Sequence, residues 1–149
     1  MEITIRAVTK EDINKLRPLM INYIADFYQR PCPEEKELEK FIVHLIEHPR
    51  EGKQFVAERN GSLIGFATLY FTYSTLQLKR AAIMNDLFVG EEYRGEKVGE
   101  KLFNACLEYI RMNGFAYMSW ETARDNIPAQ AFYRKMGGHP SEWMAYEIS

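Results

Sequence analysis

A single run of sequence, from Asn85 to Leu102, holds most of the residues whose types and spacing suit chemistry. It begins with a mostly apolar stretch, turns at Gly90, and passes glycines and charged side chains before an amphipathic stretch. Where a strand leads into a helix in this way, unpaired N–H groups and the positive end of the helix dipole bind anions. The run therefore predicts a pyrophosphate site, with a solvated turn that binds nothing as the alternative. The P-loop and Gly-x-Gly-x-x-Gly signatures are both missing.

Asp86 is the acidic side chain within the apolar stretch 81–89. A carboxylate there must either pair with a nearby cation or face a cleft. In a cleft it could act as a general base and take a proton from an amine, directly or through a water. In a regular strand, successive side chains point to opposite faces of the sheet. We therefore expect Asn85 to point away from Asp86 and not to share its task.

Other polar residues suit metal or thiol chemistry less well. His44 and His48 stand four residues apart and could ligate a metal, yet His-Glu-x-x-His is missing and no third ligand is evident. We therefore expect no metal. Cys32 and Cys106 are far apart and form no Cys-x-x-Cys pair, which predicts neither a zinc site nor a disulfide and fits a reducing cytoplasm.

Length and composition narrow the class of protein. The chain has 149 residues, which is enough for one domain, residues 1–149, with a core of its own. Its net charge of −2 and the lack of a basic block with interleaved aromatics argue against nucleic acid as a partner. No apolar run approaches the roughly 20 residues that span a bilayer, and the N-terminus lacks a signal peptide's apolar core. A cytoplasmic protein is expected, without membrane attachment.

Hydrophobic periodicity indicates the elements that must position these residues. Apolar side chains at helical spacing predict helices over residues 13–27, 34–48, 98–110 and 126–136, with Pro18 bending the first or delaying its start. Alternating or short apolar runs predict strands at residues 3–5, 54–59, 63–72, 81–89, 117–122 and 143–148. Asn60-Gly61 favours a type I′ hairpin turn. The order of elements predicts an α+β domain on a mixed sheet.

Two blocks of this sequence resemble motifs of the GCN5-related N-acetyltransferase (GNAT) superfamily. The turn after residue 89 is similar to its acetyl-CoA-binding motif, Arg/Gln-x-x-Gly-x-Gly/Ala, with Arg94 and Gly99 at the first and last positions. Lys97 stands where the family usually has its inner glycine, and Gly95 lies two residues earlier. Residues 126–137 match every fixed position of the family's Asn-x-x-Ala-x-x-Phe-Tyr-x-Lys-x-Gly helix. The order of elements agrees over nearly the whole chain.

The resemblance implies a fold and a cofactor site. The fold would be a largely antiparallel mixed sheet flanked by helices, whose strands splay apart where the pantetheine arm of acetyl-CoA lies. Leu87 and Val89 would contact pantetheine through their backbone, and residues 95–100 would bind the pyrophosphate. The cofactor-binding residues it implies are Leu87, Phe88, Val89, Arg94, Gly95, Glu96, Lys97, Val98, Gly99, Glu100, Asn126, Ala129, Phe132 and Lys135. Phe132 is expected mainly to pack in the core.

The resemblance also implies a mechanism. Tyr133 matches the position whose hydroxyl lies near the cofactor sulfur, which makes it the candidate general acid, with Asp86 as the candidate base. Tyr23, Phe27 and Tyr28 lie where the family often lines its acceptor site, although a helix facing the core would look much the same. Trp120 is expected to belong to the core.

The expected activity is transfer of an acetyl group from acetyl-CoA to a primary amine of a small molecule, such as a polyamine or amino acid. Direct attack in a ternary complex needs no acyl-enzyme. The alternatives are acetylation of a protein or peptide lysine or N-terminus, and a non-catalytic acyl-CoA-binding sensor module. A homodimer through the strand 143–148 is expected, because Trp143, Met144 and Tyr146 would lie on an exposed strand edge.

Overall fold

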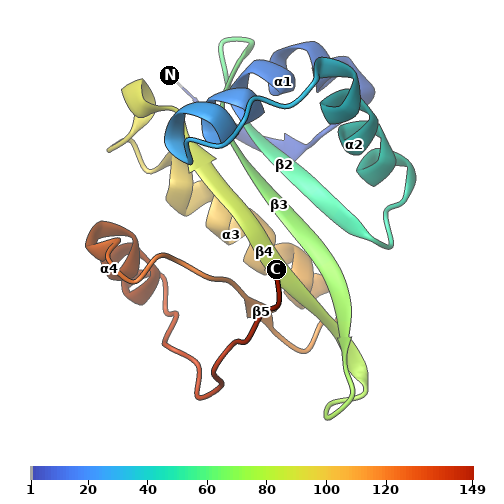
Figure 1. Ribbon diagram of the computed structural model, residues 1–149, viewed down its shortest axis with the longest axis vertical. Coiled ribbons are helices and arrows are strands. Elements are labelled where there is room, and N and C mark those ends of the chain that lie inside the picture. The colour runs from blue at the N-terminus through green and yellow to red at the C-terminus, as the bar shows by residue number, and fades with distance from the viewer. Residues whose placement is uncertain (1) are drawn as a thin grey trace.

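The computed structural model describes residues 2–149, which form one mixed sheet with helices on both faces (Figure 1). The five strands lie side by side in chain order. The first four are antiparallel to their neighbours, and the last is parallel to the fourth. The predicted α+β class, with a largely antiparallel mixed sheet, is confirmed. The strands are β1 (Thr4–Ala7), β2 (Gly52–Arg59), β3 (Ser62–Ser74), β4 (Lys79–Val89) and β5 (Met118–Ser119).

The hairpin of β2 and β3 turns at Asn60-Gly61, as the sequence predicts. Asn60 has φ 53° and Gly61 has φ 78°, so both residues occupy the left-handed region that a type I′ turn requires. Glycine reaches this region without cost, and asparagine reaches it more readily than most residues do. The turn brings Arg59 opposite Ser62, and an irregularity between Ala57 and Glu58 then shifts the register by one residue, so that Gly52 lies opposite Tyr70.

Helices cover the sheet from two sides (Figure 1). On one face lie α1 (Ile13–Ile21) and α2 (Glu35–Glu47), and on the other lies α3 (Val98–Met112), with α4 (Ile127–Lys135) near the end of the chain. Short 3₁₀ turns, η1 (Lys10–Asp12) and η3 (Glu91–Tyr93), precede α1 and α3. The first helix continues through Pro18 and then widens into a π turn, η2 (Asn22–Phe27).

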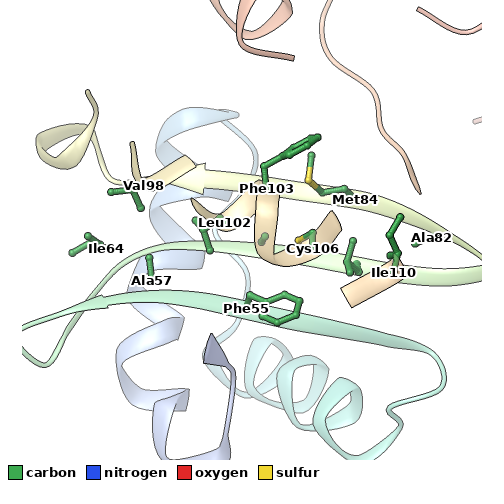
Figure 2. Close-up of a cluster of buried hydrophobic side chains, with 12 residues drawn as sticks. Phe55, Ala57, Ile64, Ala82, Met84, Val98, Leu102, Phe103, Cys106 and Ile110 are labelled. Atoms are coloured by element: carbon green, nitrogen blue, oxygen red, sulfur yellow. The ribbon is translucent and has the colours of Figure 1, made fainter. Parts of the chain in front are cut away.

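Two apolar cores result, one on each face of the sheet. Figure 2 shows the larger core, in which Leu102, Phe103 and Cys106 of α3 pack on inward-facing side chains of β2, β3 and β4. The smaller core joins Leu16 of α1 and Ile42 of α2 to the opposite sheet face. All five of these side chains are almost fully buried. Their burial holds the two helical layers firmly against the sheet.

The sheet opens at the end where β4 runs into the turn. β4 and β5 share two residue pairs, Ala82 with Met118 and Ile83 with Ser119, and Figure 1 shows the chain then leading away from β4 toward α4. The prediction of a strand over 117–122 was too long. Past Ser119 the chain diverges from β4 and loses the neighbour whose hydrogen bonds a strand needs. This divergence is the splay that the resemblance implies.

The predicted strand 143–148 does not form. Residues 140–149 contain no regular secondary structure, and the side chains of Trp143, Met144, Tyr146 and Ile148 are more than 70% exposed. A strand requires a partner edge for its backbone groups, and β5 is too short to supply one. Alternation of apolar residues was therefore a misleading signal here, because no sheet edge in residues 2–149 pairs with this segment.

Candidate active site

The turn from β4 to α3 has the shape that the sequence indicates for an anion site. After η3, Gly95 has φ +87° and Lys97 has φ 65°, and α3 begins at Val98. The first N–H groups of α3 have no acceptor within the helix, so they are available to a phosphate. Lys97 therefore adopts the left-handed conformation that a glycine would take most easily. An L-residue held there costs roughly 1–2 kcal/mol, so the loop keeps its shape against local strain.

Carboxylates in this turn are paired with cations from elsewhere in the fold. Glu96 forms an ion pair with Arg59 of β2, and Glu100 lies 3.3 Å from the Nζ atom of Lys135 on α4. The negative charges nearest the predicted pyrophosphate site are thus partly offset. The second pair also joins the first turn of α3 to the end of α4, across the splay.

Gly99 leaves room where the cofactor motif predicts it. A Cβ atom built on Gly99 would lie 3.7 Å from Val89 Cγ2 and 3.8 Å from Phe132 Cζ, which are ordinary contact distances. The missing side chain therefore faces the space between β4 and α4. Exposed helix N–H groups, two left-handed residues and this cradle together fit the pyrophosphate and pantetheine of acetyl-CoA.

Arg94 lies differently from what its motif position alone would indicate. Its Nε atom donates to the carbonyl oxygen of Val89 at 3.1 Å, and its guanidinium lies 5.7 Å from the ring centres of both Phe27 and Phe88. The side chain therefore reaches from the predicted pyrophosphate turn to η2. Arg94 links the two halves of the site, the cofactor turn and the helix predicted to line the acceptor.

Residues 87–89 divide between the two faces of the sheet, as a strand requires. Leu87 and Val89 pack toward the core beneath α3, on the side where Gly99 and Phe132 lie. Phe88 is 5% exposed and packs on the other face with Phe66 and Tyr23. The side chain of Phe88 is therefore part of the core on the acceptor side, and only its backbone faces the edge that β5 leaves open.

A β-bulge at Asn85 corrects one expectation. Thr68 pairs with Asp86 and Leu69 pairs with Met84, so Asn85 is an extra residue in β4. The bulge interrupts the alternation of side chains. Asn85 Nδ2 consequently donates to Asp86 Oδ1 at 3.1 Å. The expectation that Asn85 would point away from Asp86 was wrong, because it assumed a regular strand.

Asp86 is satisfied by neutral donors. Tyr23 donates to Asp86 Oδ1 at 2.7 Å, and Asn85 and the buried hydroxyl of Thr68 also hydrogen-bond to the carboxylate. Burial raises the pKa of Asp86, and these three hydrogen bonds offset part of that rise. Burial, then the charge of Asp86, raises the pKa of Tyr70 to about 12. The partly buried carboxylate is thus held by hydrogen-bond donors and has its basicity increased, as a general base at neutral pH requires.

The π turn gathers the aromatic residues that the sequence indicates for the acceptor site. Tyr28 N–H donates to the carbonyl of Tyr23, five residues earlier, at 3.1 Å. This spacing brings both the fourth and the fifth following residue over Tyr23. The Tyr23 and Phe27 rings stack at 6.4 Å, and Tyr28 meets each of them edge-on at 5.0 Å. Phe27 and Tyr28 are about half exposed, so the cluster is open to solvent on one side.

The helix α4 carries the candidate acid. Asn126 Oδ1 accepts from the N–H of Ala129 at 3.2 Å, which makes Asn126 the N-cap of α4. Phe132 packs edge-on against Phe103 of α3. Tyr133 packs on Trp120, with ring centres 5.2 Å apart. Burial, followed by the nearby Tyr28, raises the pKa of Tyr133, so its hydroxyl stays protonated at neutral pH.

Some residues on the acceptor side cannot be identified from the sequence. Tyr70 and Thr68 on β3 and the ring of Phe41 on α2, which meets Tyr70 edge-on at 6.4 Å, belong to the surroundings of Asp86. They lie in segments whose patterns predict an ordinary strand and an ordinary amphipathic helix. Their two-residue or helical spacing is what a core face would also show, so no local pattern distinguishes them. The bulge that aligns Asn85 with Asp86 likewise has no sequence signature.

Comparisons with known proteins agree with this architecture. The profile of the Acetyltransferase (GNAT) family matches residues 19–138. The uncharacterized N-acetyltransferase YhfO of Bacillus subtilis (strain 168) is 33% identical over 91% of this chain and 89% of its own. A candidate [ribosomal protein bS18]-alanine N-acetyltransferase of the same organism is 26% identical over 89% and 83%. The crystal structure of a probable acetyltransferase has a TM-score of 0.86 at 28% identity, covering 100% of this chain and 97% of its own.

Proposed function

This chain belongs to the GNAT family of acyl-CoA-dependent N-acetyltransferases, and we propose that its acceptor is a primary amine on a small, cationic molecule. Polyamines and amino acids are the two classes to test first. Acetyl-CoA would be the cosubstrate, held by the β4–α3 turn and by α4, and the amine would attack it directly in a ternary complex.

The observation that carries this proposal is a partly buried carboxylate beside a cluster of aromatic side chains. Tyr23 donates to Asp86, and the charge of Asp86 raises the pKa of Tyr70. The rings of Phe27, Tyr28 and Phe88 pack on Tyr23. Aromatic faces and a carboxylate both attract an ammonium group. In the part of the chain that the structure describes, no Lys or Arg forms an ion pair with Asp86. Its negative charge therefore remains available to an incoming cation.

The same residues support a route for the protons. Asp86, with its pKa raised by burial, would take a proton from the ammonium, directly or through a water, and leave a neutral nitrogen to attack the thioester carbonyl. Tyr133, protonated because burial raises its pKa, would give a proton to the departing thiolate. As the intermediate collapses, the nitrogen loses its second proton, which restores the Tyr133 hydroxyl. The proton held by Asp86 passes to the solvent, so each turnover releases one proton.

A covalent route through cysteine lacks support. Cys106 is fully buried in the larger core, where burial raises the pKa of its thiol to about 12. The thiolate is the nucleophilic form of cysteine, and a thiol with so high a pKa stays protonated at neutral pH. Cys32 is exposed and precedes α2. Direct transfer to the amine therefore fits the described residues better than an acyl-enzyme does.

Acetylation of a protein amine is the second candidate, favoured by one comparison. A relative 26% identical bears the name of a ribosomal-protein-alanine N-acetyltransferase. The exposed side of the Tyr23, Phe27 and Tyr28 cluster could also receive a peptide N-terminus. A non-catalytic acyl-CoA sensor is the third candidate, but pure binding would need neither a protonated tyrosine nor a carboxylate of raised pKa.

The test follows free thiol release from acetyl-CoA with polyamines, amino acids and Ala-initiated peptides as acceptors, over a range of pH. We expect a polyamine or amino acid to give the highest kcat/KM. Asp86→Asn should fold and bind acetyl-CoA normally but lose turnover by about 100- to 10,000-fold, most severely at low pH, where more of the amine is protonated.

Glu108→Gln is the control, because Glu108 is exposed and lies in the second half of α3, away from the turn that precedes the helix. It should match the wild type in melting temperature, acetyl-CoA affinity and turnover. Full activity of Asp86→Asn with an unchanged pH profile would eliminate Asp86 as the base. Preference for the peptide would favour the second candidate. If none of the acceptor classes caused thiol release, the sensor would be favoured.

The location and remaining partners of the protein are also proposals. No helix in residues 2–149 is both long and apolar enough to cross a lipid bilayer. The net charge of −2 offers no field that would attract nucleic acid. We propose that the enzyme acts in the cytoplasm as a homodimer, on an amine acceptor and acetyl-CoA alone.

A further inference from the structure

A second group of chemically competent side chains lies at the C-terminal end of α2 and shares no residue with the acetyl-transfer site. It consists of His44, His48 and Glu51, each offering one ligand atom, and these three atoms lie within 4.8 Å of one another. Two positions on β3 give its distance from that site. The carbonyl of Glu51 accepts from the N–H of Phe71, and Val89, at the cofactor end of β4, pairs with Gly65. The cluster is thus offset from the cofactor end by six residues of β3, or roughly 20 Å along the strand.

The structure supplies the third ligand that the sequence did not reveal. His44 and His48 stand four residues apart on α2, so both rings project from the same side of the helix, with centres 4.0 Å apart. The helix ends at Glu47, and the short turn after it folds Glu51 back toward the helix. His44 Nε2 lies 2.9 Å from Glu51 Oε1.

A hydrogen bond already orients the His48 ring for a metal. His48 Nδ1 lies 2.8 Å from the carbonyl oxygen of His44. A carbonyl can only accept, so Nδ1 must carry the hydrogen, and Nε2 of His48 keeps a free lone pair. Metal-binding histidines commonly have their second nitrogen held in this way by a backbone carbonyl or a carboxylate. Between His44 and Glu51, a proton occupies the place that a cation could take.

We propose that His44, His48 and Glu51 bind a zinc ion. Two imidazole nitrogens and a carboxylate oxygen form a ligand set that Zn²⁺ favours, and a water would complete the tetrahedron. Ligand bonds of about 2.1 Å require neighbouring ligand atoms about 3.4 Å apart. The ligand atoms lie within 4.8 Å of one another, so side-chain rotations need to change any separation by no more than about 1.4 Å. Zn²⁺ takes the place of the hydrogen on His44 Nε2. The ring then carries its hydrogen on Nδ1 through exchange with the solvent, so it binds as a neutral imidazole.

The site is accessible and joins two elements. The side chains of His44 and Glu51 are 45% and 57% exposed, so an ion can enter without any unfolding. Glu51 immediately precedes β2, so bound zinc fastens the end of α2 to the start of that strand. Binding only to the folded chain raises the melting temperature with metal concentration. The proposed zinc is therefore a clamp on the fold and takes no part in acetyl transfer.

The experiment uses the full chain without an affinity tag, stripped with EDTA and then titrated with Zn²⁺ in calorimetry and thermal melting. We expect one ion per chain, a micromolar dissociation constant, and a rise in melting temperature that EDTA reverses. Co²⁺ as a probe should give the intense visible absorption of a four-coordinate site. His44→Gln, His48→Gln and Glu51→Gln should each weaken Zn²⁺ binding by at least tenfold while keeping the metal-free melting temperature.

His139→Gln is the matched control, because His139 is exposed and lies outside the cluster. It should bind Zn²⁺ as the wild type does. Absence of saturable binding at 100 µM Zn²⁺ would overturn the proposal, and so would binding that survives both histidine substitutions. Octahedral Co²⁺ spectra would also overturn it, because they indicate loose surface coordination.

Discussion

The hydroxyl of Tyr23 donates to Asp86 Oδ1 at 2.7 Å, and this bond connects the π turn to the bulged strand β4. Burial, together with the charge of Asp86, raises the pKa of Tyr23 well above its usual range, so the hydroxyl remains a donor. The bond stabilises the charged form of Asp86 and opposes the rise that burial causes in the pKa of this carboxyl. Tyr23 would thus tune the proposed base without touching the proton that is transferred.

Replacing Tyr23 with phenylalanine should raise the pKa of Asp86 further, because the carboxylate loses a donor and stays buried. The carboxylate is the active form of a base, so the acid limb of the kcat/KM profile should move to higher pH. Steady-state rates across the pH range measure this shift. Tyr70→Phe is the control, since Tyr70 senses the charge of Asp86 but makes no hydrogen bond to it among the described residues. An unmoved acid limb in Tyr23→Phe would contradict the role.

The Tyr133→Phe variant should lose kcat far more than it changes the KM for acetyl-CoA. The lost hydroxyl matters mainly as the thiolate forms, and general acids contribute about 100- to 10,000-fold. The ring would keep its packing on Trp120, so the melting temperature should hold. Tyr73→Phe, at a position 69% exposed, serves as the control. A loss of less than threefold, with chemistry limiting turnover, would assign the proton to another donor.

Side chains added at Gly99 should weaken acetyl-CoA binding in proportion to their size. The Cβ of Gly99→Ala makes only ordinary contacts with Val89 and Phe132, so this variant should fold normally. Gly99→Leu should fill the space between β4 and α4 and reduce affinity by at least tenfold in calorimetry. Melting curves of both variants separate lost binding from lost folding. Unchanged affinity in a folded Gly99→Leu protein would remove the cofactor assignment of this turn.

A homodimer should form through the C-terminal segment, although this segment is not the strand that its sequence pattern indicated. Trp143 and Tyr146 are 82% and 89% exposed, and large apolar side chains left open in this way mark association surfaces. Light scattering at micromolar concentration should give twice the chain mass, and a Trp143→Ser, Tyr146→Ser double variant should give a monomer. A monomeric wild-type protein would contradict the prediction.

Local patterns in the sequence determined most elements of the fold. The Asn60-Gly61 turn lies where its residue types predict it, α3 ends just before Gly114, and Asn126 caps α4. Each depends on short-range chemistry, because a left-handed turn, a glycine at a helix end and a side-chain cap need only neighbouring residues. The two motif blocks likewise led to the family that the comparisons identify.

Contacts between distant segments decided what the sequence could not. The bulge at Asn85, the π turn that gathers Tyr23 with Tyr28, and the short β5 arise when elements pack against partners far along the chain. The predicted strand 143–148 does not form for the same reason, since backbone pairing requires an available strand edge as well as a suitable sequence pattern. Glu51 completes the His44 and His48 pair only after the turn that ends α2. Residue types thus set the chemistry available, and tertiary packing set which groups meet.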